Sequence, residues 1–235
     1  MNIILLRPED WLDASTVELR DRRHGHIRNV LKSPVGASLR VGEIGGDRGF
    51  GIVTLAGDTA TQLTVTLSQQ APSRHTFDIA LALPRPKMLR RVFRTVAEMG
   101  VAHLHLIHSA RVEKSFWQTP LLQPERIAAA LHAGLERSGD TIAPQVHLHR
   151  FFKPFIEDRA PTLLQGRLGW IAHQAAAEPI SRSGGPALIM LGPEGGFVPF
   201  ELALAQSAGF SEGHLGGRTL SVDTAVTAAL SQALG

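Results

Sequence analysis

From Phe77 onward the chain alternates short apolar runs with amphipathic segments, and this alternation constrains the fold more than any other feature. "FDIALAL", "VAHLHLIHS" and "ALIML" have the length and composition of short buried strands. The segment from about Lys87 to Met99 and the segment "QPERIAAALHAGLERSG" carry apolar residues at helical spacing. Pro124 lies near the start of the second helix and Gly139 beyond its end. Strands that alternate with helices favour a mostly parallel sheet covered on both faces.

The remaining elements of this α/β region follow the same pattern. We expect strands at "QVHLHR" and "RLGWIAHQ", a helix after Pro199 and a short return strand between Phe210 and Leu215. The last helix is "DTAVTAALSQAL", for which Asp223 is a good N-cap.

The first 72 residues have a different character. "SLRVGEIGGDRGFGIVTL" alternates apolar and polar residues around glycine-rich turns, and "QLTVTLSQ" has high β propensity. "RDRRHGHIRNVLKSPVG" has the composition of a short basic helix that stops at Pro34, and the polar stretch Gln69–Thr76 is typical of a linker. We therefore predict two domains: residues 1–72 as a small antiparallel barrel or sandwich, and residues 73–235 as an α/β domain.

Composition excludes several classes of protein. The 235 residues include no cysteine, which excludes disulfides, thiolate nucleophiles and thiolate metal sites. No apolar run approaches the ~20 residues that cross a bilayer, and "MNIILLRPEDW" lacks the features of a signal peptide. The net charge is only +3, so the pI of about 9.9 is weak evidence for nucleic-acid binding. We expect a soluble cytoplasmic protein.

Two glycine-containing turns each connect the end of a predicted strand to a helix. The first is "LGPEGGF", Leu191–Phe197, and the second lies within "HLGGRTLSVDTAVTAAL". Ligands of open α/β sheets collect at such strand ends, and glycine lets the backbone approach a ligand closely. Neither a Walker loop nor a G-x-G-x-x-G fingerprint is present. Either turn alone is also compatible with an ordinary connection, but together they predict one cavity shared by Gly195 and Gly216.

Several motifs resemble those of a known family. They are "HGHIRNVLKSPVG", "VFRTVAEMGV", "LERSGDTIAP", "LGPEGGF" and "LGGRTLSVDTA", and they extend over most of the chain. The sequence resembles the SPOUT-class RNA methyltransferases, and among them the enzymes that methylate N3 of a uridine in bacterial small-subunit ribosomal RNA.

This resemblance implies both a fold and a set of ligands. The implied fold is an N-terminal PUA-like β-barrel that contacts RNA, followed by an α/β domain tied in a trefoil knot, which is rare among proteins. The implied cofactor is S-adenosylmethionine, and the implied partners are ribosomal RNA or the small ribosomal subunit and a second copy of the chain. The cofactor-binding residues would be Leu191, Gly192, Glu194, Gly195, Gly196, Leu215, Gly216, Gly217, Leu220 and Thr224.

Methylation of uracil N3 requires help from the protein, because this nitrogen carries a proton near neutral pH. The site must favour the anion through a base or a nearby positive charge. We predict that Arg218 supplies the charge and that Glu194 fixes the first turn through a hydrogen bond, the alternative being that Glu194 faces water. Asp223 is either a catalytic carboxylate or simply the cap of the last helix.

The chain departs from the family pattern at several positions. The family carries arginine, threonine and glutamate where this chain has Ser221, Val222 and Asp223, and glutamine and lysine where it has Arg94 and Thr95. These departures predict a divergent member. The alternatives are an RNA-binding protein that has lost catalysis, a methyltransferase with another RNA target, or an α/β enzyme for another adenine ligand.

Basic residues form two clusters that predict RNA contacts, although a solvated face is the alternative for each. One is the helical face of Lys87, Arg90, Arg91 and Arg94, and the other is an N-terminal group that includes Arg22, Arg23, His24 and Arg28.

Two histidine pairs, His103 with His105 and His147 with His149, have the spacing that places both side chains on one face of a strand. We expect packed or surface histidines and no metal, because no third ligand is evident nearby.

Overall fold

A computed structural model describes residues 1–180 and 185–232 and divides the chain into two compact units. The N-terminal unit consists of Met1–Ser73 and His132–Ala143, and the C-terminal unit consists of Arg74–Leu131 and Pro144–Gly235. The predicted domains 1–72 and 73–235 are each continuous in sequence. In the structure, residues 132–143 belong instead to the N-terminal unit.

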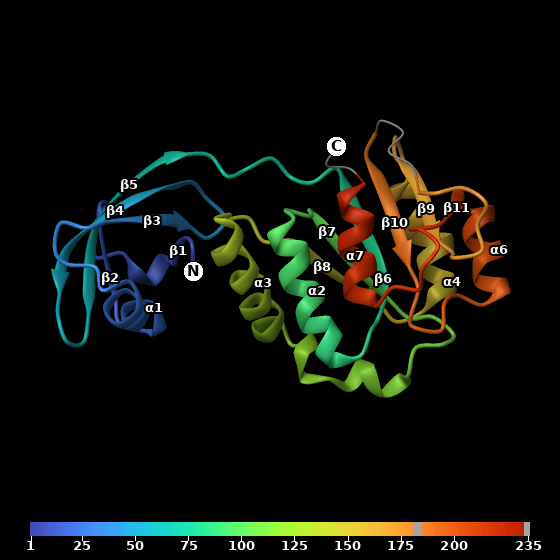
Figure 1. Cartoon of the computed structure of the whole chain (residues 1–235), viewed down its shortest axis with the longest axis horizontal. Coiled ribbons are helices and arrows are strands. Elements are labelled where there is room, and N and C mark those ends of the chain that lie inside the picture. The colour runs from blue at the N-terminus through green and yellow to red at the C-terminus, as the bar shows by residue number, and fades with distance from the viewer. Residues whose placement is uncertain (181–184, 233–235) are drawn as a thin grey trace. The chain divides into compact units, whose positions relative to one another are not determined.

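The N-terminal unit is built on a five-stranded sheet in the order β1-β3-β4-β5-β2. The strands are β1 Ile4–Leu6, β2 Thr16–Leu19, β3 Ser38–Glu43, β4 Arg48–Ala56 and β5 Thr61–Gln69. The sheet is not antiparallel throughout as predicted, because β1 pairs with β3 in parallel. Since β1 and β2 are its edges, the described strands form a curled half-barrel (Figure 1). One face of this sheet packs a core that includes Val17, Leu19, Val41 and Leu63.

The predicted basic helix is present as α1, Arg22–His26, followed by a π-helical turn, Ile27–Leu31. It ends at Lys32, whose φ of 52° is left-handed, two residues before Pro34. A left-handed residue cannot continue a right-handed helix, so the stop comes slightly earlier than the proline.

The segment 132–143 completes the hydrogen bonding of the N-terminal unit. The carbonyl oxygen of Glu136 accepts from the Asn2 amide at 2.6 Å, and that of Thr141 accepts from the Gly45 amide at 2.9 Å. The Arg48 guanidinium donates to the Gly139 carbonyl oxygen at 3.1 Å. These bonds explain why the segment belongs with a sheet far away in sequence.

The C-terminal unit contains a six-stranded sheet in the order β11-β9-β10-β6-β7-β8, and every pair is parallel, as predicted. Its strands are β6 Phe77–Ala82, β7 His103–Ile107, β8 Gln145–His149, β9 Leu168–Ala172, β10 Ala187–Leu191 and β11 Phe210–Gly213. Strands β6 and β10 are adjacent and buried at every position. Burial on both faces is why these strands are almost wholly apolar; the exception is Asp78 in β6, which pairs with Arg167 at 2.6 Å.

Helices connect these strands. Helices α2 and α7 pack against each other beside the sheet (Figure 1). The α-helices are α2 Pro86–Glu98, α3 Pro124–Ser138, α4 Phe152–Pro154, α5 Ala160–Leu163, α6 Pro199–Ser207 and α7 Val222–Ser231. Helix α7 has Ser221 as its N-cap, so the prediction that Asp223 is the cap is wrong; Asp223 lies in the first turn. No helix in residues 1–180 and 185–232 is long and apolar enough to cross a membrane. The trefoil knot stays a prediction.

Candidate functional site

The turns that follow β10 and β11 face one cavity of about 440 Å³. We call residues 192–198 the first turn and residues 214–221 the second turn. Gly195 and Gly196 line the cavity from the first turn, and Gly216 lines it from the second. The prediction that Gly195 and Gly216 share one cavity is therefore confirmed. Strands β10 and β11 both pair in parallel with β9, so all three end at the same edge of the sheet and the two turns lie close together.

The first turn needs its glycines for steric reasons. A Cβ atom on Gly192 would lie 3.3 Å from both the Gly196 Cα and the Phe197 ring, which is tighter than an ordinary contact. Gly196 has a φ of 71° and donates from its amide to the Pro193 carbonyl oxygen at 2.8 Å. This positive φ favours glycine, so the sequence "GPEGG" forms a tight turn at the cavity wall.

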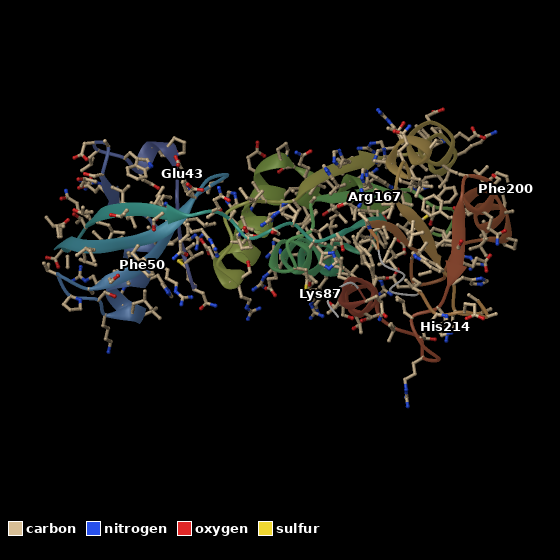
Figure 2. The ribbon with its side chains drawn as sticks, turned by 90° about the horizontal axis from the view of Figure 1, so that it is seen from above. Glu43, Phe50, Lys87, Arg167, Phe200 and His214 are labelled. Atoms are coloured by element: carbon tan, nitrogen blue, oxygen red, sulfur yellow. The ribbon has the colours of Figure 1, made fainter. Side chains whose placement is uncertain are left out.

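The second turn is held by polar contacts of its own residues. Gly216 has a φ of 108°, and its amide donates to Nδ1 of His214 at 3.0 Å; His214 is labelled in Figure 2. Thr219 donates from its hydroxyl to Oε1 of Gln174 at 3.1 Å, and Gln174 lines the same cavity from the end of β9. Three strand ends therefore contribute to one site.

Glu194 fixes the first turn through an arginine. Its Oε1 accepts from Nε of Arg85 at 3.1 Å, and both side chains are partly exposed. The predicted hydrogen bond of Glu194 is present, but its donor, Arg85, was not predicted. Arg85 follows β6, which lies next to β10 in the sheet, and that position was the available signal.

A second arginine was also missed. Arg111 follows β7, lines the cavity and donates from Nη1 to the carbonyl oxygen of Gly195. It stood in the sequence directly after the predicted strand "VAHLHLIHS". Polar residues at this position of an α/β sheet are candidates for ligand binding.

Most of the predicted cofactor residues line the cavity, and three predicted residues do not. Those in the lining are Leu191, Gly192, Glu194, Gly195, Gly196, Leu215, Gly216, Arg218 and Leu220. The residues outside it are Gly217, Asp223 and Thr224.

Asp223 forms contacts outside the cavity. It accepts hydrogen bonds from Oγ of Ser221 at 2.6 Å and from Nη1 of Arg91 at 3.2 Å. The bond from Ser221, with that from Arg91, lowers the pKa of Asp223. A carboxylate stabilised in this way is a weak base, so the geometry favours a structural role for Asp223.

Arg218 is exposed on the second turn and lines the cavity. No residue in the described part of the chain forms an ion pair or hydrogen bond with its guanidinium. Its charge is therefore available to an anion in the cavity.

The N-terminal basic cluster is mostly paired, which corrects part of the prediction. Arg23 is 4% exposed and donates to Asp10, Asp21 and the Leu5 carbonyl oxygen. Although burial lowers the pKa of Arg23, the hydrogen bonds that its guanidinium donates to Asp10 and Asp21 outweigh it and raise the pKa. His24 is also buried and contacts the Thr61 hydroxyl at 2.9 Å. Burial removes Arg23 and His24 from any RNA-contacting surface.

The other two members of this cluster are partly exposed and each has an acidic partner. Arg22 pairs with Glu136, and Arg28 pairs with Asp58 at 2.8 Å. They reach the surface, but much of their charge is already neutralised.

The helical basic cluster lies on the exposed side of α2. Lys87, Arg90, Arg91 and Arg94 are exposed, while Leu89, Val92, Phe93 and Val96 are buried, and Figure 2 shows Lys87 on the outer side of the helix. Arg91 pairs with Asp223. Among the described residues, Lys87, Arg90 and Arg94 have no ion-pair partner.

The four histidines of β7 and β8 form a stacked ladder. Nδ1 of His103 lies 3.2 Å from Nε2 of His147, and Nδ1 of His105 lies 3.1 Å from Nε2 of His149. The His105 and His147 rings stack with centroids 4.6 Å apart. Burial, together with the neighbouring His147, His149 and His103, lowers the pKa of His105 to about 3. In residues 1–180 and 185–232, no group of three or more histidines or acids is placed to hold a metal ion.

Comparison with known proteins gives consistent results. The family model described as "RNA methyltransferase domain" matches residues 71–234. The chain is 28% identical to the Ribosomal RNA small subunit methyltransferase E of Treponema pallidum, over 100% of this chain and 91% of that protein. It is also 28% identical to the Synechocystis protein of the same name, over 97% and 76% of the two chains.

Solved structures share the fold. A Ribosomal RNA small subunit methyltransferase E from Neisseria gonorrhoeae, determined bound to S-adenosyl methionine, has a TM-score of 0.75 at 20% identity and covers 98% of this chain and 95% of its own. A probable rRNA-methyltransferase from Porphyromonas gingivalis has a TM-score of 0.76 at 23% identity, with 98% and 96% coverage. The predicted α/β fold is confirmed. Because the family model covers most of the chain, including both turns of the cavity, the protein belongs to the RNA methyltransferase domain family.

Proposed function

We propose that this protein is an S-adenosylmethionine-dependent methyltransferase that modifies N3 of a uridine in small-subunit ribosomal RNA. The observation that carries the proposal is the single cavity shared by the turns after β10 and β11. Support comes from the full-length relatives, which are small-subunit ribosomal RNA methyltransferases by name, and from the Neisseria structure bound to this cofactor.

The residues of the cavity fit an adenosyl ligand. The volume of about 440 Å³ falls within the usual range for small-molecule sites, roughly 300–1,000 Å³. Apolar side chains, among them Leu191, Leu215, Leu220 and Val222, line it beside the backbone of both turns. An apolar lining suits an adenine ring, and backbone amides and carbonyls suit its polar edge.

Methyl transfer divides the chemistry between cofactor and protein. When bound, the cofactor supplies an electrophilic methyl group on a sulfonium. We assign to Arg218 the stabilisation of negative charge that develops on the pyrimidine, because it is the exposed arginine of the cavity without a described partner. We assign Glu194 a minor contact with Arg85, which lies outside the first turn. We assign Asp223 no direct contact with the pyrimidine.

RNA binding is assigned to the exposed face of α2, where Lys87, Arg90 and Arg94 are free to contact phosphates. Arg22 and Arg28 contribute less, because acidic partners offset their charge. We further propose that the protein acts as a homodimer in the cytoplasm, as the resemblance implies, since one chain offers a limited surface to a folded RNA.

One observation favours a second candidate, an RNA-binding protein of this fold without catalysis. Ser221 stands where the resembling family has an arginine, and its hydroxyl is engaged locally with Asp223 at 2.6 Å and with Thr224 at 2.9 Å. A hydroxyl used in this way cannot replace the charge of a guanidinium.

Two measurements separate the candidates. Calorimetry with S-adenosylmethionine tests the cavity, and absence of both heat and thermal shift would refute the proposed function. Incubation of the protein with methyl-labelled cofactor and undermethylated small ribosomal subunits then separates enzyme from binder. Label in the ribosomal RNA at N3 of a uridine supports the methyltransferase, and cofactor binding without transfer supports the second candidate.

A further inference from the structure

Arg111 contacts the first turn at Gly195, a residue with few limits on its backbone conformation. Its Nη1 donates to the carbonyl oxygen of Gly195, and a Cβ atom on Gly195 would lie 3.0 Å from Cδ of Arg111. The aliphatic part of the arginine therefore packs against the turn while its charged end forms a charge-assisted hydrogen bond. Such bonds are roughly twice as strong as neutral ones.

The backbone beside Arg111 is itself fixed to the far end of the turn by a buried carboxylate. Glu201 is 3% exposed; its Oε1 accepts from the Ala110 amide at 2.7 Å, and its Oε2 accepts from the Val198 amide at 3.0 Å. The backbone next to Arg111 is therefore held in place by Glu201. Both carboxylate oxygens of Glu201 accept hydrogen bonds from backbone amides, so its role is structural.

The second contact to the turn is weaker. The pair between Arg85 and Glu194 is partly exposed on both sides, and ion pairs of this kind contribute little. Gly195 and Gly196, by contrast, have broad conformational freedom in the absence of a constraint. The Arg111 bond is exposed as well, but it reaches the backbone of the turn and is backed by the aliphatic contact at Gly195, so it restrains the part of the turn that faces the cavity.

We infer that Arg111 is a positioning residue that holds the first turn in the conformation that accepts an adenosyl ligand. This inference rests on the proposed function only for the identity of the ligand. Without the Arg111 bond the first turn samples other conformations. The adenosyl ligand then has to shift the turn back to the conformation that binds it. The apparent affinity falls by the fraction of molecules in that conformation.

The test compares two ligands and three variants. Arg111→Met keeps the aliphatic length and removes the donors, Arg111→Lys retains one donor, and Arg85→Met is the matched control on the weaker contact. Calorimetry measures the Kd of S-adenosylhomocysteine and of 5′-methylthioadenosine, which lacks the amino-acid carboxylate. We expect Arg111→Met to weaken both ligands alike by about 10-fold, Arg111→Lys to restore part of the loss, and Arg85→Met to cost less.

A ligand-free measurement accompanies this test. Hydrogen exchange at the Gly196 amide, which bonds to the Pro193 carbonyl oxygen, should be faster in Arg111→Met while exchange in the β6 and β10 strands is unchanged.

Two results would overturn the inference. Weaker binding of S-adenosylhomocysteine alone would make Arg111 a carboxylate-binding residue, and unchanged affinity with unchanged exchange would leave it no role in the turn. Failure of the unmodified protein to bind either ligand would instead refute the proposed function, while faster exchange at Gly196 would still support the restraint.

Discussion

Both basic clusters contain a pair of adjacent arginines, but the two clusters lie in different environments. In the N-terminal unit, Arg23 is enclosed by Asp10 and Asp21, whereas in the C-terminal unit Arg90 and Arg94 extend from α2 without a described partner. The same residue type thus forms buried ion pairs in one cluster and stays exposed in the other. The number of arginines in a run does not distinguish these roles, but the acids placed around them by the fold do.

The largest effect is expected from breaking the buried network. Arg23→Met leaves Asp10 buried without its two-point partner, and the loss of one member of a buried pair costs about 3–5 kcal/mol. Urea denaturation followed by a probe in the N-terminal unit measures this cost. Arg28→Met, which removes only an exposed pair with Asp58, is the control and should cost less than about 1 kcal/mol. Equal effects of the two variants would show that burial of the Arg23 network adds nothing to the stability of this unit.

The next effect concerns RNA. Arg90→Glu combined with Arg94→Glu should weaken binding to the small-subunit ribosomal RNA and reduce the slope of log K against log salt by about 1.5–2, because about two phosphate contacts are lost. Filter binding at several salt concentrations measures the slope. Arg28→Glu serves as the comparison and should change the slope less, since Asp58 already neutralises Arg28. An unchanged slope in the α2 variant would remove this face from the RNA surface.

Acid should destabilise the C-terminal unit through a buried histidine. The pKa of His105 is about 3 in the folded protein, against an ordinary unfolded value near 6.5. The unfolded state therefore binds more protons below pH 6.5, so stability falls as the pH falls. From pH 7 to pH 5.5 this group should cost the C-terminal unit about 1 kcal/mol. Burial lowers the pKa of His147 and His149 in the same direction.

Urea midpoints at the two pH values, measured with probes in each unit, test this expectation. His105→Phe should reduce the acid sensitivity of the C-terminal unit. Equal acid sensitivity in the variant would place the titrating group elsewhere.

The smallest effect is expected from breaking the ion pair between Asp223 and Arg91, the paired arginine on the basic face of α2. Asp223→Asn removes the partner of Arg91 and adds one unpaired cation to the α2 face. Because the pair is exposed on the arginine side, the stability cost should stay below about 1 kcal/mol, while RNA affinity rises slightly. Thermal denaturation and the same filter-binding measurement test both changes. A large loss of methyl transfer with unchanged cofactor affinity would instead restore a catalytic role to Asp223.

Local patterns predicted much of the C-terminal unit. The runs at β6 and β10 are buried at every position, and the predicted basic face of α2 is exposed. The helical segment Phe152–Leu163 was missed, since two prolines and clustered aromatics obscure its periodicity. The parallel pairing of β1 with β3 was also missed, because a short apolar run does not identify its distant partner.

In the site, too, features set by neighbouring residues were predicted, whereas contacts set by the strand order were not. The cavity shared by Gly195 and Gly216 was predicted from the turns themselves. Arg85 and Arg111 were not, because they reach the first turn only through the order of β10, β6 and β7 in the sheet. The burial of Arg23 likewise depends on Asp10, which lies on another segment of the unit.

Because residues 132–143 belong to the N-terminal unit, the order of synthesis affects how that unit folds. A nascent chain that has just completed β5 still lacks the carbonyl groups that bond Asn2, Gly45 and Arg48. The N-terminal sheet can therefore reach its final state only after translation has passed Ala143, well into the other unit. A protease cut between Ser73 and His132 would separate that sheet covalently from the residues that complete it, so the released fragment should be less resistant to further digestion.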